Sequence, residues 1–250
     1  MKLADLRGLT RSLMMYYGVP GQARRLHSFY QPFISPGDLC FDIGAHVGNR
    51  MRAWLALGAR VVALEPQPTY LGFLEFAYGR NPSVTLIGKA AGAERGETRM
   101  MVSGNAPTVS SLSAEWVEQV KTTDETFSWV EWNGELRVQV VTLEDLIAEH
   151  GEPTFVKIDV EGYELEVLKG LRRPLKALSF EYLRSALPMA EACMERIQEL
   201  AEYEFNFTVI EETEFAAAGW MKGEEMMRVL RTLPDRATSG DVYARKKGNV

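Results

Sequence analysis

One short segment limits the folds open to this chain of 250 residues. Residues 39–43 are apolar except for Asp42, and glycines follow at positions 44 and 48 before an amphipathic run begins. This pattern is typical of a buried parallel strand that turns into a helix, so it predicts an α/β fold. Glycines at such a turn let the backbone approach a ligand, and the N–H groups of the helix N-terminus can bind an anion. We therefore expect a nucleotide-binding turn here.

Two acidic residues narrow the choice of nucleotide. Asp42 would repel a pyrophosphate but can accept hydrogen bonds from an ammonium group, and S-adenosylmethionine carries an ammonium and a carboxylate at its amino-acid end. Glu65 ends the next strand-like run, where a methyltransferase or a nicotinamide enzyme places a carboxylate on ribose hydroxyls. The spacing Gly44-x-x-x-Gly48 departs from G-x-G-x-x-G, because His46 stands where a glycine would let the backbone reach pyrophosphate. A dinucleotide is therefore disfavoured.

The composition fits one large α/β domain. Hydrophobic residues make up 46% and charged residues 25% of the chain, which is ordinary for a globular protein. The net charge of -6 disfavours a general nucleic-acid binder, because phosphate binding needs a basic face. Cys40 and Cys193 form neither a metal-binding spacing nor a disulfide framework. With no apolar run long enough for a membrane span and no targeting segment, we expect a cytoplasmic protein.

Strand-like and helix-like segments alternate along most of the chain, which predicts a parallel sheet with right-handed crossovers. An amphipathic helix at 3–17 belongs to an N-terminal helical extension of residues 1–36, which could cap the pocket. The segment of about 93–141 breaks the alternation with two extra strand-like runs, so it is predicted to be a β-rich insertion lying over the edge of the sheet. Strands are expected at 39–43, 60–64, 84–88, 177–182, 205–210 and 241–245 and from 155 onward. Helices are expected at about 48–57, 67–78, 143–149 and 190–201, and a further helix starts after Gly162.

Acidic residues stand at the ends of four expected strands. These residues are Asp42, Glu65, Asp159 and Glu181. Lys157, Asp159 and Glu161 alternate at one strand exit, so the residues before the turn project to one side. Because charges at the carboxyl ends of central strands face the ligand crevice, we expect these residues to form one site.

Three motifs closely resemble the FkbM family of S-adenosylmethionine-dependent methyltransferases. They are D-I-G-A-H-V-G at 42–48, Glu65-Pro66, and K-I-D-V-E-G at 157–162, of which the last is the most specific. The resemblance extends from about residue 37 to 182 and includes S-S-L at 110–112. It implies one Rossmann-like class I methyltransferase domain, residues 37–247, with a seven-stranded sheet whose last two strands form an antiparallel hairpin. One departure is His46, since the family usually has Asn there.

The resemblance also implies methyl transfer to oxygen, on a hydroxyl of a small molecule, sugar or glycan. Asp159 is the first candidate for the base that accepts the hydroxyl proton, and Lys157, Glu161 and Glu181 complete the candidate catalytic set. Lys157 could tune Asp159, bind an anionic part of the acceptor, or be a structural counter-ion. The candidate cofactor-binding residues are Asp42, Gly44, Ala45, His46, Gly48, Glu65, Pro66 and Ala90.

Alternatives stay open at this point. Asp159 and Glu181 could together hold Mg²⁺ or Ca²⁺, but the positive charge of Lys157 beside them opposes a cation, so no metal ligand is assigned. An NAD-dependent oxidoreductase and a non-catalytic S-adenosylmethionine-binding protein are the other candidate functions. The expected partner is a small-molecule or carbohydrate acceptor, not nucleic acid, and a homo-oligomer is left open.

Thermal stability in the presence of ligand separates the two cofactor classes. S-adenosylmethionine or S-adenosylhomocysteine should raise the melting temperature, and NAD should not. A ligand at about 100 times its dissociation constant stabilises a protein by roughly 2.7 kcal/mol, and for this size each kcal/mol moves the midpoint by roughly 2–4 °C. A rise of several degrees is therefore expected in a thermal melt. A shift with NAD alone would contradict the predicted cofactor.

Overall fold

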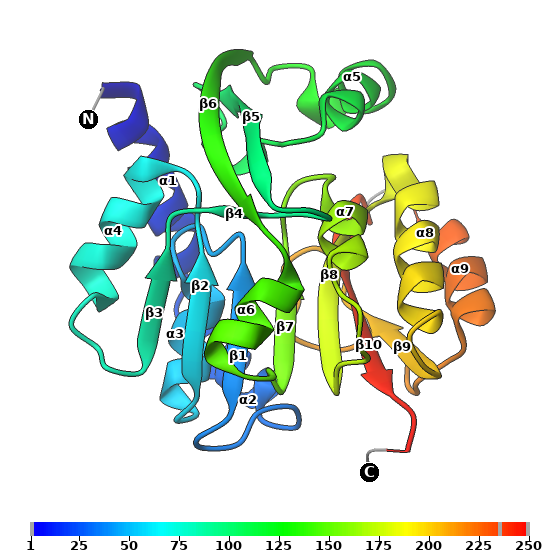
Figure 1. Cartoon of the computed structure of the whole chain (residues 1–250). Coiled ribbons are helices and arrows are strands. Elements are labelled where there is room, and N and C mark those ends of the chain that lie inside the picture. Colours follow the sequence, from blue (N-terminus) through cyan, green and yellow to red (C-terminus); the bar gives the residue numbers. More distant parts are fainter. Residues whose placement is uncertain (1–2, 235–236, 249–250) are drawn as a thin grey trace.

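The computed structural model describes residues 3–234 and 237–248, and it has an α/β architecture (Figure 1). Within these residues the main sheet has seven strands in the order β3-β2-β1-β7-β8-β10-β9. Strand β10 runs antiparallel to β8 and β9, and the other neighbours are parallel. The predicted Rossmann-like sheet is therefore confirmed, and its last two strands, β9 and β10, are antiparallel neighbours as expected. They do not form a direct hairpin, because helix α9 (Gly223–Arg231) lies between them in the chain. The strands of the main sheet are β1 (Leu39–Ile43), β2 (Arg60–Leu64), β3 (Val84–Ile87), β7 (Phe155–Ile158), β8 (Ala177–Leu183), β9 (Tyr203–Phe207) and β10 (Ser239–Lys246).

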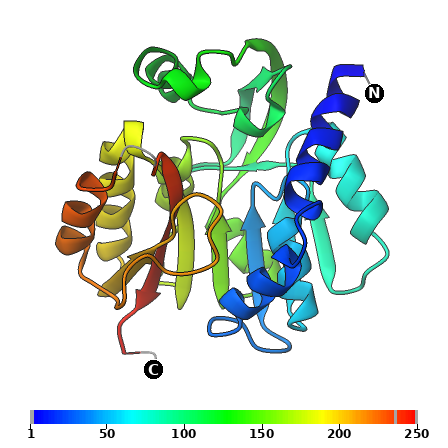
Figure 2. The ribbon, with the colours of Figure 1, turned by 180° about the vertical axis from the view of Figure 1, so that it is seen from behind.

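Helices cover both faces of the main sheet, so its central strands β1 and β7 are apolar except for Asp42 and Lys157. Strands β1 and β7 are buried at every position. Figure 2 shows the face covered by α2, with the segment 208–222 running beside this helix. One face packs against α2 (Gln22–Tyr30), α3 (Asn49–Ala56) and α4 (Pro68–Tyr78), and the other against α6 (Leu143–His150), α7 (Glu164–Lys169), α8 (Leu187–Gln198) and α9 (Gly223–Arg231).

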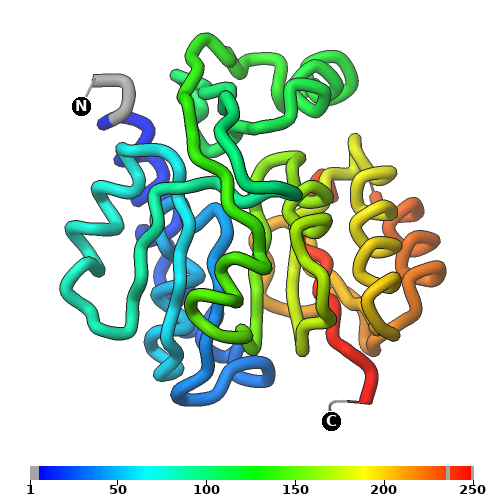
Figure 3. The backbone as a smooth tube through the Cα atoms, viewed as in Figure 1, coloured from blue at the N-terminus to red at the C-terminus, as the bar shows by residue number. Residues whose placement is uncertain are grey.

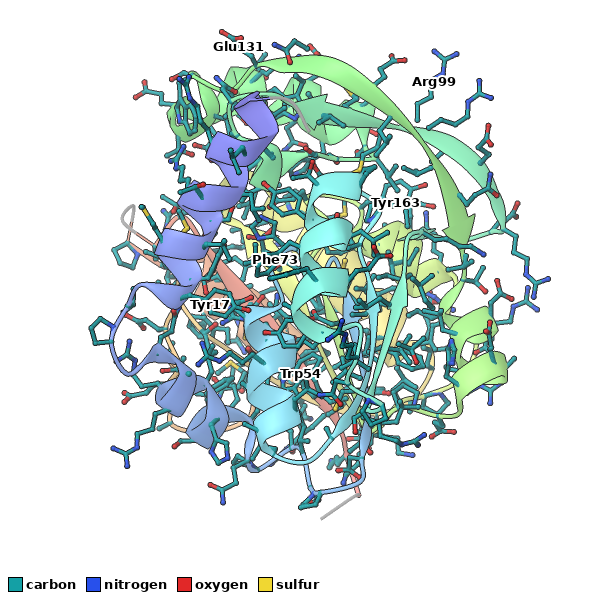
Figure 4. All side chains as sticks on the ribbon, turned by 90° about the vertical axis from the view of Figure 1, so that its left-hand side faces the viewer. Tyr17, Trp54, Phe73, Arg99, Glu131 and Tyr163 are labelled. Atoms are coloured by element: carbon teal, nitrogen blue, oxygen red, sulfur yellow. The ribbon has the colours of Figure 1, made fainter. Side chains whose placement is uncertain are left out.

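Helix α1 (Leu3–Tyr17) is the predicted N-terminal helix, and it lies against the turn between β1 and α3. The hydroxyl of Tyr17 donates a hydrogen bond to the carbonyl oxygen of Val47 at 2.7 Å and lies 3.0 Å from the hydroxyl of Tyr78. Figure 4 shows Tyr17 on the side of α1 that faces α3, on which Trp54 lies. Whether this helix acts as a cap stays a prediction. Among the described helices, none combines the length and the apolar character needed to cross a membrane.

The insertion forms a smaller sheet that stands above the carboxyl ends of the parallel strands (Figure 1). The backbone leaves the main sheet after β3 and returns to it through α6 (Figure 3). As predicted, the insertion is rich in β-structure, and it crosses the carboxyl ends of the parallel strands. Its elements are β4 (Ala90–Ala91), β5 (Gly96–Ser103), η1 (Pro107–Val109), α5 (Ala114–Thr123), η2 (Glu125–Phe127) and β6 (Trp132–Val141). Outside the insertion, a short helix η3 (Arg184–Ala186) follows β8.

Two contacts fasten the insertion to the exit of β7. The hydroxyl of Ser111 donates to the carbonyl oxygen of Glu161 at 2.5 Å. The ring of Trp116, which is 3% exposed, lies so close to Gly162 that a Cβ at this glycine would overlap it. The insertion therefore has a fixed position over the strand ends.

Three helices are absent from the sequence-based prediction. Helices α2, α5 and α9 have nine or ten residues each, whereas α3 and α6, which were predicted, have eight each, so length does not explain the omission. Helix α5 starts at Ser113, whose side chain accepts a hydrogen bond from the backbone N–H of Trp116. This cap lies between turn residues, where the pattern of apolar residues alone does not reveal it.

Gly44 lets the exits of β1 and β7 meet. Its φ is 87°, and a Cβ there would overlap the carbonyl oxygen of Asp159. The backbone N–H of Asp159 donates to the carbonyl oxygen of Ile43 at 2.9 Å, which holds the two exits together. Only glycine fits both the positive φ and this approach.

Alanine substitutions at two glycines test this close approach. Gly37 has a φ of 89°, and a Cβ at this glycine would have no neighbour within 4 Å, so Gly37→Ala should cost only the roughly 1–2 kcal/mol of left-handed strain. Gly44→Ala adds a backbone overlap and should cost more than about 3 kcal/mol. Urea denaturation measures both losses. Equal losses would contradict the close packing of Gly44 on Asp159.

Candidate functional site

Two cavities adjoin at the carboxyl ends of β1, β2 and β7. The larger cavity lies between the main sheet and the insertion, and the smaller cavity lies between α1, α3 and the exit of β7. Both are lined by Tyr16, Gly44, His46 and Asp159, so one ligand could extend through both. The larger cavity is lined further by residues that include Glu65, Pro66, Gln67, Ala90, Met100, Ser110 and Glu161, and the smaller by Asp42, Ala45, Asn49, Arg50, Lys157 and Glu211.

Most predicted cofactor-binding residues line one of these cavities, and Gly48 is the exception. It lies just before α3 with a φ of 73°. A Cβ there would lie 2.8 Å from Cε of Met51 and 2.9 Å from Cδ2 of Leu74. Gly48 therefore shapes the turn and does not line the larger or the smaller cavity.

Glu65 holds the turn as well as facing the larger cavity. It is 3% exposed, and its two carboxylate oxygens accept hydrogen bonds from the backbone N–H groups of His46 at 2.9 Å and Gln67 at 2.8 Å. Burial raises the pKa of Glu65 to about 7, although both hydrogen bonds oppose this. A carboxylate has about four lone-pair directions, so Glu65 can still accept hydrogen bonds from ribose hydroxyls.

The backbone conformation explains how His46 replaces the asparagine that is usual in the resembled family. His46 has a φ of 50°, and asparagine, aspartate and histidine are the side chains enriched in this left-handed region. Its Nε2 lies 3.1 Å from the hydroxyl of Ser12, and burial lowers the pKa of the ring to about 4. The imidazole is therefore neutral at pH 7 and links the turn to α1.

Asp42 offers a buried acceptor to the smaller cavity. It is 2% exposed, and among the described residues its Oδ2 atom has no hydrogen-bond partner. Burial raises the pKa of Asp42 to about 6, against the attraction of Lys157. An unsatisfied buried acceptor costs about 1–3 kcal/mol. An ammonium group placed in the smaller cavity would satisfy it, so Asp42 fits the amino-acid end of S-adenosylmethionine.

Lys157 is a buried counter-ion. It is 2% exposed, and its Nζ atom lies 2.8 Å from Oδ2 of Asp159 and 3.1 Å from Oδ1 of Asp241. Burial alone would lower the pKa of Lys157, but the attraction of the two aspartates raises it well above its ordinary value. Of its three predicted roles, the geometry favours the counter-ion, and this role also tunes Asp159.

Asp159, Glu161 and Glu181 form a half-buried acidic cluster. One carboxylate oxygen from each residue lies within 4.8 Å of the other two. Although burial opposes the shift, Lys157 holds the pKa of Asp159 below its ordinary value. Burial and the charge of neighbouring acids, Asp159 among them, raise the pKa values of Glu161 and Glu181 well above their ordinary value. The predicted catalytic residues are therefore together, and the cluster readily binds a proton.

A family profile described as Methyltransferase FkbM domain matches residues 42–237. The chain belongs to the FkbM methyltransferase family. This confirms the family predicted from the sequence. Methyl transfer, with S-adenosylmethionine as the donor, is what membership of this family implies. The individual site residues stay predictions, supported by the cavities and contacts above.

Similar proteins include one curated relative. The hexuronic acid methyltransferase AglP of Haloferax volcanii is 27% identical over 150 residues, which cover 57% of this chain and 54% of AglP. The chain therefore spans about half the length of AglP.

Solved structures with a similar backbone include two methyltransferases. The precorrin-6y C5,15-methyltransferase of Geobacter metallireducens has a TM-score of 0.48 and 14% identity, over 90% of this chain and 87% of that one. The TehB-like methyltransferase of Corynebacterium glutamicum has a TM-score of 0.47 and 10% identity, over 98% of both chains. The fold assignment of this FkbM-family chain rests on its own strand order.

Sequence reasoning missed the charged partners around Lys157. Arg50, on α3, lies 2.8 Å from Oε2 of Glu211 and 3.7 Å from Oδ2 of Asp241. Asp241 was a visible signal, because an acid within an otherwise apolar strand must be paired when the strand is buried. Its partners come from distant parts of the chain, so the sequence does not identify them.

A conservative change at Glu65 tests its place in the cofactor site. In Glu65→Gln, an NH₂ group faces one of the two backbone N–H donors and the charge is lost. Loss of hydrogen bonds to a charged group costs about 1.5–3 kcal/mol, so S-adenosylhomocysteine should bind roughly 10- to 150-fold more weakly by calorimetry. Glu75→Gln, at an exposed position of α4, is the matched control and should bind normally. Equal affinity of both variants would remove Glu65 from the site.

Proposed function

We propose that this protein transfers the methyl group of S-adenosylmethionine to a hydroxyl group of a small molecule, sugar or glycan. The observation that carries the proposal is the position of the acidic cluster: Asp159 and Glu161 line the same cavity as Glu65. The cofactor supplies an activated methyl group on its sulfonium. The residues of this chain have to place the acceptor oxygen in line, exclude water and accept the hydroxyl proton.

The acidic cluster supports a neutral, hydroxyl-bearing acceptor. Carboxylates accept hydrogen bonds from hydroxyls, and a protonated carboxyl also donates one. AglP is a hexuronic acid methyltransferase, which agrees with a sugar acceptor but not with its neutrality, because a hexuronic acid carries a carboxylate as well as hydroxyls. Three acidic side chains so close together would repel an anionic carboxylate at the reacting position. A hydroxyl is therefore favoured over a carboxylate as the methylated group.

The charges divide the work within the acidic cluster. Asp159 was predicted as the base, but its pKa is held low by Lys157, which makes it a weak proton acceptor. Burial and the charge of neighbouring acids raise the pKa values of Glu161 and Glu181, so each of these carboxylates, when ionised, is a stronger proton acceptor than Asp159. We therefore assign proton acceptance to the cluster as a unit. Asp159 stays ionised and one of the glutamates takes the proton.

The insertion and α1 supply the walls that exclude water. Ser111 and Trp116 fix the insertion above the exit of β7, next to the acidic cluster. Tyr16 of α1 closes the opposite side, where it lines both cavities. Burial and the neighbouring acids raise the pKa of Tyr16, so its phenol keeps its proton and can donate a hydrogen bond.

A cation at the acidic cluster is the second candidate mechanism. The mutual spacing of Asp159, Glu161 and Glu181 would suit oxygen ligands of Mg²⁺ or Ca²⁺, and a cation would lower the pKa of a bound hydroxyl. Against this, Nζ of Lys157 already lies 2.8 Å from Oδ2 of Asp159. The metal-free mechanism is therefore our preferred proposal. The expectations about nucleic acid, oligomeric state and location stay predictions.

The dependence of turnover on pH identifies the base. Methyl transfer from labelled S-adenosylmethionine is measured on an acceptor found by screening glycans and glycosides. If a glutamate accepts the proton, turnover falls as the pH drops through its raised pKa, and Glu161→Gln or Glu181→Gln lowers turnover by roughly 10²–10⁴-fold. Asp159→Asn should shift the acid limb to lower pH, because it removes the charge that raises the glutamate pKa values.

Three outcomes would contradict this assignment. If turnover stays constant as the pH falls to the pKa of an ordinary aspartate, and only Asp159→Asn loses turnover, then Asp159 is the base. Metal-stripped enzyme that is silent until Mg²⁺ or Ca²⁺ is added would establish the cation instead. Binding of S-adenosylmethionine without transfer to any screened acceptor would favour the non-catalytic alternative.

A further inference from the structure

The smaller cavity is lined by charged groups of both signs. Asp42, Asp159 and Lys157 line it from the sheet, and Arg50 lines it from α3 together with its ion-pair partner Glu211. Both acidic and basic groups therefore face this cavity. The cavity meets the larger one at Gly44 and His46. A ligand whose nucleoside lies near Glu65 would therefore extend its other end into this smaller cavity. In S-adenosylmethionine that end is an amino acid with one ammonium and one carboxylate.

We propose that Arg50 binds the carboxylate of the cofactor's amino-acid end, and that Glu211 holds the Arg50 guanidinium until the cofactor displaces it. This inference rests on the proposed function and adds to it a specific anchor and a specific competitor. Glu211 is then a stand-in carboxylate supplied by the protein itself.

The position of Arg50 supports the first half of the proposal. Its side chain is 9% exposed, and its Nη2 atom lies 2.8 Å from Oε2 of Glu211. The buried partner, Asp241, is more distant at 3.7 Å and is already bound by Lys157 at 3.1 Å. The guanidinium is thus oriented toward a carboxylate at the wall of the cavity. A planar guanidinium is well suited to paired hydrogen bonds with a carboxylate.

The backbone before Glu211 supports the second half. Ile210 has a φ of 53°, an unfavourable conformation for a β-branched residue, and it is 51% exposed. Strain of this kind persists only where the surroundings hold it. The backbone N–H of Ile210 donates to Ser239 at 2.8 Å, and Arg50 holds the next residue, Glu211, whose side chain is 43% exposed. Release of Glu211 into solvent would therefore be easy.

Asp42 completes the recognition of a zwitterion. Its unpartnered Oδ2 atom is buried in the wall of the same cavity, where it can accept a hydrogen bond from the ammonium group. Arg50 lines the same cavity from the second position of α3, and the N–H groups of a helix N-terminus favour a carboxylate there. The two ends of the amino acid therefore have separate partners on the sheet and on the helix.

Two ligands distinguish the contribution of Arg50 to binding of the amino-acid end from the contribution of the rest of the site. S-adenosylhomocysteine carries the amino-acid end, and 5′-methylthioadenosine lacks it. Calorimetry of wild type, Arg50→Gln and Glu211→Gln gives both affinities for each protein. Arg50→Gln should weaken S-adenosylhomocysteine by roughly 10- to 100-fold and leave 5′-methylthioadenosine within about twofold. Glu211→Gln should strengthen S-adenosylhomocysteine severalfold, because the competitor is weakened, with 5′-methylthioadenosine unchanged.

The controls keep the possible failures apart. Glu212→Gln, at the exposed neighbouring position, should leave both affinities as in wild type. Equal weakening of both ligands in Arg50→Gln would overturn the anchor, since Arg50 would then act through the fold. If Arg50→Gln does not fold, the Glu211→Gln variant still tests the proposal. If Glu211→Gln and Glu212→Gln bind S-adenosylhomocysteine with equal affinity, Glu211 does not compete with the cofactor for Arg50. Wild type that binds neither ligand would instead refute the proposed function.

Discussion

The ion pairs of Lys157 set the charge of the whole site. One buried ammonium lies between Asp159 and Asp241, and it faces Asp42 across the pairing of β1 with β7. Its attraction keeps Asp159 ionised, and that negative charge raises the proton affinity of Glu161 and Glu181. A buried charge left without partners would be strongly unfavourable. The protonation of the cluster, and with it the proposed chemistry, therefore depends on one buried counter-ion.

The main sheet could be predicted because its signals are local. A strand that is apolar at nearly every position, a glycine turn and an acid at the strand exit are all visible in one short segment such as 39–49. The strand ends that carry Asp42, Glu65, Asp159 and Glu181 follow from the same pattern, since parallel strands expose their carboxyl ends at one edge.

The rest depends on contacts that no local pattern encodes. Arg50 meets Glu211 across 161 positions of the chain, and Lys157 meets Asp241 across 84. Even Glu65, predicted correctly as a residue of this edge, has a second task that the sequence hides, because its oxygens hold the backbone of His46 and Gln67. Charges whose partners are distant are recognised only after the sheet brings them together.

The position of β10 has a consequence for how this molecule is made. This strand comes from residues 239–246 but lies between β8 and β9, and it carries Asp241. While the chain is being synthesised, β8 and β9 have no strand between them, and Lys157 and Arg50 lack one of their counter-ions. Non-local pairings of this kind form slowly, and unpaired strand edges promote association between chains. The nascent protein therefore has a vulnerable period that lasts until β10 emerges from the ribosome.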